Sequence, residues 1–278
     1  MTTNPEEALA ALGFTETEAR IYCELLRGGP ATGYRLAQAI GKAPANTYQA
    51  LSVLAQKGAV LVDDGDTKTH RAAPPEELLA GLKRGFDARR EDAQAALAGL
   101  GAPMADDRIY QLRTPAQTYE RARAMIAAAR EVVLFDAFPG PLAELTPELT
   151  AAAARGVIVA GLTYGAATGL PFLTVDSHGG GLIGERWPGQ QLSLVADAVG
   201  HLIVLLSPDG ERVKHGVWSD SAYLACIKHS GLAAEIRLSV IEAGDADVPD
   251  LSLLRAYPAG LRRLIGPAPT VSKSGDAT

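Results

Sequence analysis

Amide and basic side chains recur along one segment of the chain, between positions 35 and 71. Asn46 and Gln49 are three residues apart and face outward from a predicted helix, together with Ser52. Amide side chains can form bidentate hydrogen bonds with adenine, and cationic side chains can neutralise phosphate groups. This pattern is typical of a surface that contacts DNA. The candidate contact residues are Arg35, Lys42, Pro44, Asn46, Thr47, Gln49, Lys57, Lys68, His70 and Arg71.

Two short amphipathic helices position these side chains. In the first, Leu36, Ala37 and Ile40 form an inward face, and Gly41 ends the helix, since glycine readily adopts the left-handed conformation found there. The second helix is expected over residues 44–56, with Pro44 in its first turn. Its predicted buried stripe is Tyr48, Leu51 and Leu54.

A strand pair follows the second helix. Residues 59–62 and 68–72 are predicted as strands, and the Asp- and Gly-containing segment 63–67 is predicted as a tight turn. Helix, turn, helix and β-hairpin in this order predict a winged helix-turn-helix, which places its second helix in the DNA major groove. Because winged helices also serve as protein-interaction modules, that alternative remains open.

Composition limits the classes of protein that fit. The 278 residues have a formal net charge of -6 and a pI near 5.4, which disfavours a nonspecific polyanion binder. The start of the chain is acidic, and no apolar run reaches membrane-spanning length, so a cytoplasmic protein is expected. Cys23 and Cys226 are isolated and are expected to be buried. We therefore expect no metal and no cofactor.

A long helix is predicted over residues 76–100, after Pro74 and Pro75. Its apolar positions are spaced as in a coiled coil, which favours a homodimer. The alternative is that this helix packs on the C-terminal domain of its own chain. The candidate dimerisation residues are Leu79, Leu82, Phe86, Ala93 and Leu100.

Strands and helices alternate in the C-terminal part, which predicts an α/β domain with a mostly parallel sheet. The predicted strands are residues 108–112, 131–137, 157–164, 192–196, 201–206 and 213–218, and the predicted helices are 115–129, 142–155 and 219–241. The expected organisation is a two-domain α+β or α/β chain: a winged helix at 1–74, a helical linker at 75–101, an α/β domain at 106–266 and a disordered tail at 267–278.

The chain resembles the TrmB family of transcriptional regulators over about residues 8–100. The matching stretches are LGFTETEARIYCELLRGGPATGYRLAQAIG, NTYQALSVLAQKGAV and HRAAPPEELL. The resemblance implies a winged-helix DNA-binding domain, a helical dimerisation linker and an effector-binding C-terminal domain. That last domain is similar to a phospholipase D-type fold that has lost its chemistry, and a later stretch, HLIVLLSPDGERVKHGVWSDS, supports this.

The phospholipase D resemblance can be tested on its catalytic motif, His-x-Lys with a later Asp. His201 supplies the histidine, but Ile203 stands where the lysine is needed, and Asp209 lies in a Pro-Asp-Gly turn. Without the cation, a phosphoryl group has no charge partner. We therefore expect that the protein is not an enzyme.

A small-molecule effector site is expected near residues 165–191. This long segment follows a predicted strand at its carboxyl end, where open α/β sheets commonly bind ligands. Aromatic rings there can stack on a sugar, and carboxylates can bind hydroxyls or an amine; alternatively, the aromatic residues cover the core. The candidate effector-binding residues are Asp136, Phe138, Tyr164, Phe172, Asp176, His178, Glu185 and Trp187.

Together these features predict a dimeric, ligand-responsive, sequence-specific DNA-binding transcriptional regulator. Its partners would be double-stranded DNA, a small molecule that is a sugar in the best-known family members, and a second copy of the chain, with no membrane. Two alternatives remain: a winged-helix protein-interaction module with a structural α/β domain, and a phosphodiesterase with a regulatory domain.

Overall fold

The computed structural model forms two compact units, residues 1–103 and residues 104–278. The residues it describes are 4–63, 65, 67–100, 107–165, 169–177, 186–243 and 258–266. In those residues, no helix has both the length and the apolar composition needed to cross a membrane.

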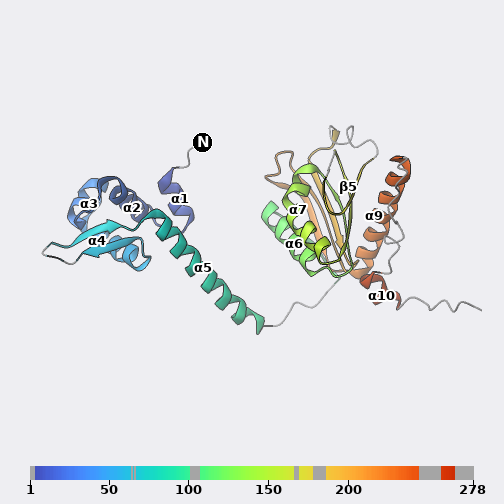
Figure 1. Cartoon of the computed structure of the whole chain (residues 1–278), viewed down its shortest axis with the longest axis horizontal. Coiled ribbons are helices and arrows are strands. Elements are labelled where there is room, and N and C mark those ends of the chain that lie inside the picture. Colours follow the sequence, from blue (N-terminus) through green and yellow to red (C-terminus); the bar gives the residue numbers. More distant parts are fainter. Residues whose placement is uncertain are drawn as a thin grey trace, which may run out of the picture. The chain divides into compact units, whose positions relative to one another are not determined.

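The first unit is helical with a small β-hairpin (Figure 1). In chain order its elements are α1 (Pro5–Ala11), α2 (Glu16–Gly28), α3 (Gly33–Ile40), α4 (Pro44–Gln56), β1 (Val60–Asp63), β2 (Thr69–Ala72) and α5 (Pro75–Ala98). This order is that of a winged helix-turn-helix followed by a long helix.

Local sequence signals begin and end these helices. The Thr15 side chain accepts a hydrogen bond from the Glu18 backbone N–H (3.3 Å), and the Glu18 carboxylate accepts one from the Thr15 backbone N–H (3.0 Å). This reciprocal capping box begins α2. Gly41, at φ 67°, ends α3 in the left-handed conformation that the sequence predicts.

The inward face of α4 differs from the prediction. Its buried residues are Thr47, Ala50, Leu51 and Leu54, whereas the Tyr48 side chain is 48% exposed. These buried residues have the spacing i, i+3, i+4, i+7 of one helix face. The core-facing side therefore begins at Thr47, one residue before the predicted Tyr48. Tyr48 instead lies across Gly33 at the start of α3, where a Cβ atom would come within 2.4 Å of the tyrosine ring.

The wing, formed by β1 and β2, is an antiparallel hairpin, and a third segment around Ala31 pairs with β2. Val60 pairs with Ala72, and Asp63 pairs with Thr69. Ala31, between α2 and α3, exchanges two backbone hydrogen bonds with His70. The middle of β2 is therefore bonded on both sides and lies against the helices.

The second unit contains a seven-stranded sheet covered by helices on both faces. Its elements are β3 (Ile109–Gln111), α6 (Pro115–Ala128), β4 (Val132–Ala137), α7 (Pro139–Ala154), β5 (Ile158–Thr163), β6 (Leu173–Asp176), β7 (Gln190–Ala196), β8 (Gly200–Leu206), β9 (Val213–Ser219), α9 (Ala222–Ala243) and α10 (Ala259–Ile265). The strand order is β3-β9-β8-β7-β4-β5-β6.

The two-domain α+β architecture is confirmed, but the expectation of a mostly parallel sheet is wrong. Within the described strands, β4–β5 and β5–β6 are parallel, and the other four pairings are antiparallel. A crossover helix, α7, joins β4 to β5, as parallel strands require. β7, β8 and β9 instead follow one another through short turns, so they can pair only as hairpins. β6 was also not predicted, since it lies inside the segment expected to be irregular.

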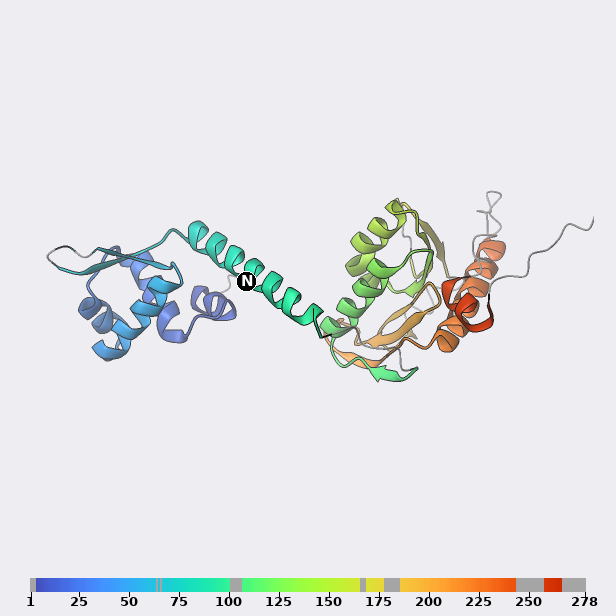
Figure 2. The same cartoon turned by 90° about the horizontal axis from the view of Figure 1, so that it is seen from below.

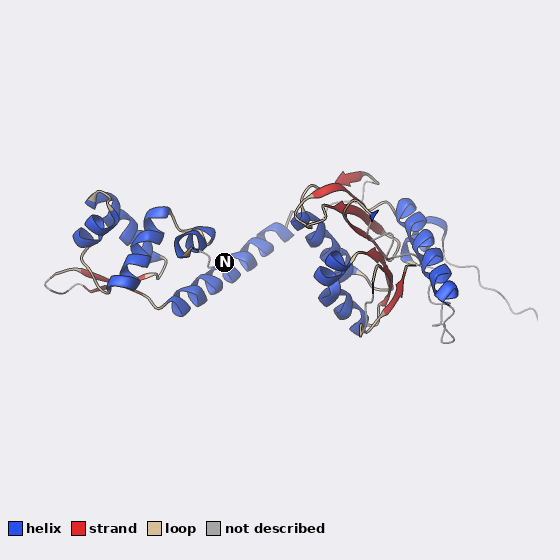
Figure 3. Ribbon diagram, turned by 90° about the horizontal axis from the view of Figure 1, so that it is seen from above, coloured by secondary structure: helices blue, strands red, loops and turns tan. Residues whose placement is uncertain are grey.

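Helices α6 and α7 cover one face of the sheet, and α9 covers the other (Figures 1 and 2). Between α6, α7 and the sheet lies a core that includes Phe135, Leu149 and Leu194. Between α9 and the other face lies a core that includes Leu134, Leu162 and Ile236. Figure 3 shows the same sandwich with the strands between the two helical layers. Alternating residues of β4 therefore serve two different cores, which is why the whole strand is buried.

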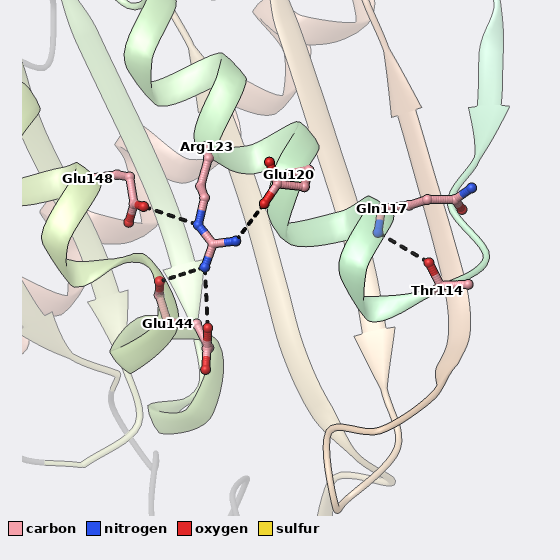
Figure 4. A network of polar contacts seen from close by, with 6 residues as sticks. All are labelled: Thr114, Gln117, Glu120, Arg123, Glu144 and Glu148. Atoms are coloured by element: carbon pink, nitrogen blue, oxygen red, sulfur yellow. Dashed lines mark hydrogen bonds and ion pairs between the residues drawn. The ribbon is translucent and has the colours of Figure 1, made fainter. Parts of the chain in front are cut away.

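Polar contacts tie α6 to α7. The Arg123 guanidinium bonds Glu120 on its own helix at 2.9 Å and reaches Glu144 at 3.3 Å and Glu148 at 3.0 Å on α7 (Figure 4). At the start of α6, the Thr114 hydroxyl accepts a hydrogen bond from the Gln117 backbone N–H at 3.1 Å.

A buried carboxylate in the β7–β8 turn holds neighbouring backbone segments in place. Asp197, in the β7–β8 turn, accepts three backbone hydrogen bonds, from Arg130, Glu131 and Val132, at 2.8–2.9 Å. Its own carbonyl accepts a hydrogen bond from the Gly260 N–H at 2.9 Å. This turn therefore fixes both the entry into β4 and the position of α10.

Candidate functional site

The outward face of α4 presents polar side chains to solvent. Pro44, Asn46, Gln49 and Ser52 are all exposed. The core-facing side of the same helix is filled by Leu51 and its neighbours, so these side chains are held on a rigid element. Such a helix, with amide groups on its free side, has the form of a major-groove recognition helix.

The amino terminus of α4 is left without a side-chain cap. Its N-cap residue is Ala43, no acidic residue lies in its first turn, and Pro44 occupies the first helical position. Backbone N–H groups at such an end carry a partial positive charge and suit an anion. The arrangement is compatible with a phosphate group of a DNA backbone.

Four of the predicted basic contacts lie on the surface of the unit. Arg35 on α3, Lys42 in the turn, and Lys68 and Arg71 in the wing are exposed. Together they provide cations on either side of α4 along the chain. The exposed cations of these four positions therefore lie around α4 rather than on it.

Three predicted contact residues have structural roles instead. The Thr47 side chain is fully buried, and its hydroxyl donates a hydrogen bond to the Ala43 carbonyl at 3.2 Å. The His70 side chain is 3% exposed, because β2 pairs on both sides at that point. The Lys57 ammonium bonds the Glu18 carboxylate at 2.7 Å and lies 4.6 Å from the centre of the Phe14 ring. These positions are corrections to the predicted interface.

Two exposed tyrosines were not predicted as part of this surface. Tyr34 on α3 is 59% exposed, and Tyr48 on α4 lies beside Gln49 with half of its side chain in solvent. The signal was present in the sequence: Thr47, Ala50, Leu51 and Leu54 fit the helical period better than a stripe that includes Tyr48.

In the second unit, the structure brings several predicted effector residues together. Asp136 is 4% exposed near the end of β4, and the Gln191 amide on β7 donates to its carboxylate at 2.5 Å. The Tyr164 ring lies 4.4 Å from the ring of Phe138, and its hydroxyl is close enough to Asp136 to affect the pKa of that carboxyl group. These side chains form a polar cluster at the carboxyl ends of β4 and β5.

Burial raises the pKa of Asp136, while hydrogen bonds from Tyr164 and Gln191 and the charge of Lys228 act in the opposite direction. Burial and the Asp136 charge raise the pKa of Tyr164. Burial and Asp136 likewise raise the pKa of Glu235. Lys228 and Glu235 both come from α9, so this helix adds two charged groups that the sequence did not connect with the cluster.

Other predicted effector residues lie elsewhere or have local roles. The Phe172 ring packs edge-on against Phe135 at 6.0 Å and joins the core. The Asp176 carboxylate accepts a hydrogen bond from the Gly165 N–H at 2.9 Å. Trp187 is 46% exposed. The two remaining candidates, His178 and Glu185, lie outside the described residues.

A hollow of about 560 Å³ lies at a different place in the same unit, between β3, α6 and β9. The Arg121 guanidinium lies 4.1 Å from the centre of the Trp218 ring, and the Tyr110 ring is 5.7 Å from it. Gln117 and Glu120 add polar groups to the wall. Aromatic rings with a cation beside them suit a planar or anionic small molecule.

The phospholipase-type motif is incomplete in space as well as in sequence. His201 is 6% exposed on β8, and burial, followed by the charge of Lys228, lowers its pKa. Asp209 is held in its turn, where it accepts hydrogen bonds from the Ser207 hydroxyl and the Glu211 N–H. In the part of the chain that the structure describes, no cluster of three His, Cys, Asp or Glu side chains is placed to bind a metal ion.

A family match covers the winged helix. Residues 9–76 match the family described as "Sugar-specific transcriptional regulator TrmB". The YrhO protein of Bacillus subtilis (strain 168) is 28% identical over 166 residues, which are 59% of this chain and 60% of that protein. The match thus spans about three fifths of the relative's length.

Solved structures resemble the chain only distantly. The archaeal chromatin protein TrmBL2 is 17% identical, with 82% of this chain and 95% of that chain covered and a TM-score of 0.37. The transcriptional regulator Tm0710 from Thermotoga maritima is 16% identical, with 35% and 70% covered and a TM-score of 0.25. Nuc from Salmonella typhimurium, a phospholipase D family member, is 14% identical, with 46% and 93% covered and a TM-score of 0.34.

The segment that matches the family, residues 9–76, is also the segment that folds as a winged helix-turn-helix. The resemblance to the TrmB family is confirmed, and it is the matched segment, residues 9–76, that carries it.

Proposed function

We propose that the protein is a sequence-specific transcriptional regulator whose DNA binding responds to a small molecule bound by the second unit. In this proposal α4 enters the major groove, Asn46 and Gln49 contact base edges, and the wing residues Lys68 and Arg71 contact phosphates. The second unit binds the effector, and α5 holds two copies together.

The exposed polar face of α4 carries the proposal. It combines amide side chains, an uncapped amino terminus and exposed cations before and after it in the chain. A protein-docking surface needs none of these features, whereas a DNA surface uses all of them. The acidic net charge of the whole chain does not oppose this reading, because the cations are local.

The experiment measures, by fluorescence anisotropy, how binding to the promoter DNA upstream of the protein's own coding sequence changes with salt concentration. We expect binding that weakens steeply with salt. Substituting Asn46→Ala together with Gln49→Ala should reduce discrimination between operator and unrelated DNA by about tenfold or more. Gln94→Ala on α5 is the matched control, since Gln94 is also an exposed amide on a helix. The absence of binding even at low salt would instead support the protein-interaction alternative.

Effector binding is proposed for the second unit, with the cluster around Asp136 and Tyr164 as the first candidate site and the hollow beside Trp218 as the second. Both combine aromatic rings with charged groups. Sugars are one ligand class to screen, because the matched family is described as sugar-specific. A ligand that binds only the folded state raises the apparent melting temperature.

Two variants separate the candidate sites. Tyr164→Phe removes the hydroxyl beside Asp136, and Arg121→Ala removes the cation over Trp218. The thermal shift caused by a positive ligand should be lost in one variant and kept in the other. Arg130→Ala, another exposed arginine of the same unit, is the control.

We further propose that the protein is not a phosphodiesterase. Ile203 replaces the phosphate-binding lysine, and Asp209 is used in a turn. No hydrolysis of bis(p-nitrophenyl) phosphate is expected. Hydrolysis that disappears in His201→Ala would contradict this proposal.

A further inference from the structure

Helix α9 has an apolar surface on the side that faces away from the sheet. Tyr223, Ile227, Leu238 and Ile241 are 63%, 60%, 55% and 66% exposed. The opposite side, which includes Ala225, Leu232 and Ile236, is buried against the sheet. A helix that is apolar on both sides is normally covered on both sides. We call the surface formed by Tyr223, Ile227, Gly231, Ala234, Leu238 and Ile241 the outer face of α9.

The order of residues along the outer face is symmetric about the middle of the helix. Counted inward from the two ends, Tyr223 corresponds to Ile241, Ile227 to Leu238 and Gly231 to Ala234. The sequence of sizes is therefore large, large, small from either end. When two such helices pack antiparallel around a two-fold axis, large residues meet large residues, and the small residues lie where the helices cross. An interface between identical chains has this isologous form.

Small residues at the centre allow the close helix contact that such packing needs. A Cβ atom added at Gly231 would meet no atom within 4 Å, so this position is open within one copy of the chain. The exposed Ala234 lies one turn further along. Packed helix axes lie about 8–10 Å apart, at the low end of this range when the contact residues are small.

The charges beside the outer face also fit a second copy. Between Ala222 and Ala243, none of the charged residues falls on the outer face itself. Lys228 and Glu235 lie along the same flank of the helix, about two turns apart. In an antiparallel two-fold pair, this flank of one copy lies beside the same flank of the other, running in the opposite direction. Glu235 of one copy therefore approaches Lys228 of the other, and the charges are of opposite sign.

We propose that the outer face of α9 is a second homodimer interface, distinct from α5, in which two copies of the second unit pack through antiparallel α9 helices. The interface joins the two proposed effector-binding domains directly. Because the interface does not depend on DNA binding, the test of this proposal is independent of the test of the proposed function.

The test is site-specific disulfide cross-linking of the full chain in the absence of DNA. Ala234→Cys places a thiol at the predicted crossing point. The matched control is Ala151→Cys, which is an exposed alanine of α7 on the other side of the sheet. Both variants keep the native Cys23 and Cys226. We expect covalent dimers to form at least about tenfold faster with Ala234→Cys, because paired helices raise the local thiol concentration.

A second variant shows whether the cross-link reports helix packing. Adding Gly231→Leu to Ala234→Cys should remove the excess rate, since leucine fits the open space of one copy but obstructs the crossing of two. Circular dichroism would verify that the variant keeps its helix content. Equal cross-linking at positions 234 and 151, or an excess rate that survives Gly231→Leu, would overturn the proposal.

Discussion

At the scale of single residues, burial separates the candidate DNA-contacting side chains from those that support the fold. Asn46, Gln49 and Arg71 are exposed, whereas Thr47 and His70 point into the core of the same domain. Residue type alone does not distinguish these groups, because threonine and histidine are common in both. The distinction comes from helix phase at Thr47 and from strand pairing at His70.

Histidines that are buried in the neutral form make the stability of the second unit depend on pH. His229 on α9 is 6% exposed, and within the described part of the chain neither of its ring nitrogens has a hydrogen-bond partner. Burial, followed by the charge of Arg237, lowers its pKa from 6.5. A lowered folded-state pKa means that the unfolded chain binds the proton more tightly. The contribution of neutral His229 to the free energy of unfolding is therefore fully present above pH 6.5 and is lost as the pH drops through the folded-state pKa.

We predict that His229→Leu flattens this dependence. Between about pH 7.5 and pH 5, the free energy of unfolding should fall less steeply than in the parent chain, by up to about 1.4 kcal/mol per pH unit for one proton. Urea unfolding at several pH values measures this slope. The control is His215→Leu on the exposed part of β9. An unchanged slope in His229→Leu would show that this histidine does not titrate on unfolding.

At the scale of elements, two helical glycines occupy opposite environments. Gly231 in α9 faces open space, whereas a Cβ atom at Gly260 in α10 would lie 1.8 Å from the Ala198 carbonyl oxygen. The first glycine weakens its helix without a steric reason inside one copy. The second glycine lets α10 approach the β7–β8 turn closely enough to bond Asp197.

The same substitution should therefore have opposite effects at these two sites. Gly231→Ala should raise the free energy of unfolding by about 1 kcal/mol through helix propensity. Gly260→Ala should lower it by about 2 kcal/mol, because either the turn or α10 must move. Chemical unfolding of the two variants at one low protein concentration compares them directly. Stabilisation by Gly260→Ala would show that α10 does not rest on this turn.

Elements were predictable wherever a local signal determined them. The capping box at Thr15 and the left-handed Gly41 are local, and each is present in the structure. Sheet direction was not predictable in this way, because it depends on which strands meet. The turn at Asp197 makes β7 and β8 a hairpin, although both strands read as buried runs that fit a parallel sheet equally well.

The candidate site shows the same limit. Helix α4, the proposed DNA-recognition helix, was placed correctly in the chain, but the phase of its buried face was off by one residue, so that Thr47 is buried in place of Tyr48. The proposed effector cluster includes Gln191, Lys228 and Glu235, which are distant in sequence from Asp136. No spacing rule connects these residues, since β7 and α9 reach Asp136 only through the fold.

At the scale of the whole molecule, α5 is the element whose surface is least explained by its own unit. Leu78 is buried against the winged helix, and Leu82 packs partly against the same core. Further along, Phe86 is 62% exposed, and every residue from 88 to 98 is exposed. Apolar side chains in solvent at coiled-coil spacing favour a partner helix, and in the proposed dimeric regulator that partner is the α5 of a second copy.

A matched pair of alanines on α5 tests this role. Ala93 lies in the apolar series, whereas Ala95 lies two residues further and faces another direction; both are exposed. Ala93→Glu should place two like charges in the helix pair, lower the molecular mass measured by sedimentation and weaken operator binding by about tenfold or more, since two linked half-site contacts reinforce each other. Ala95→Glu should change neither quantity. If both variants bind the operator as the parent does, each winged helix works alone and α5 serves only as a connector. If Ala93→Glu lowers affinity without lowering the mass, the remaining association must come from another surface, such as α9.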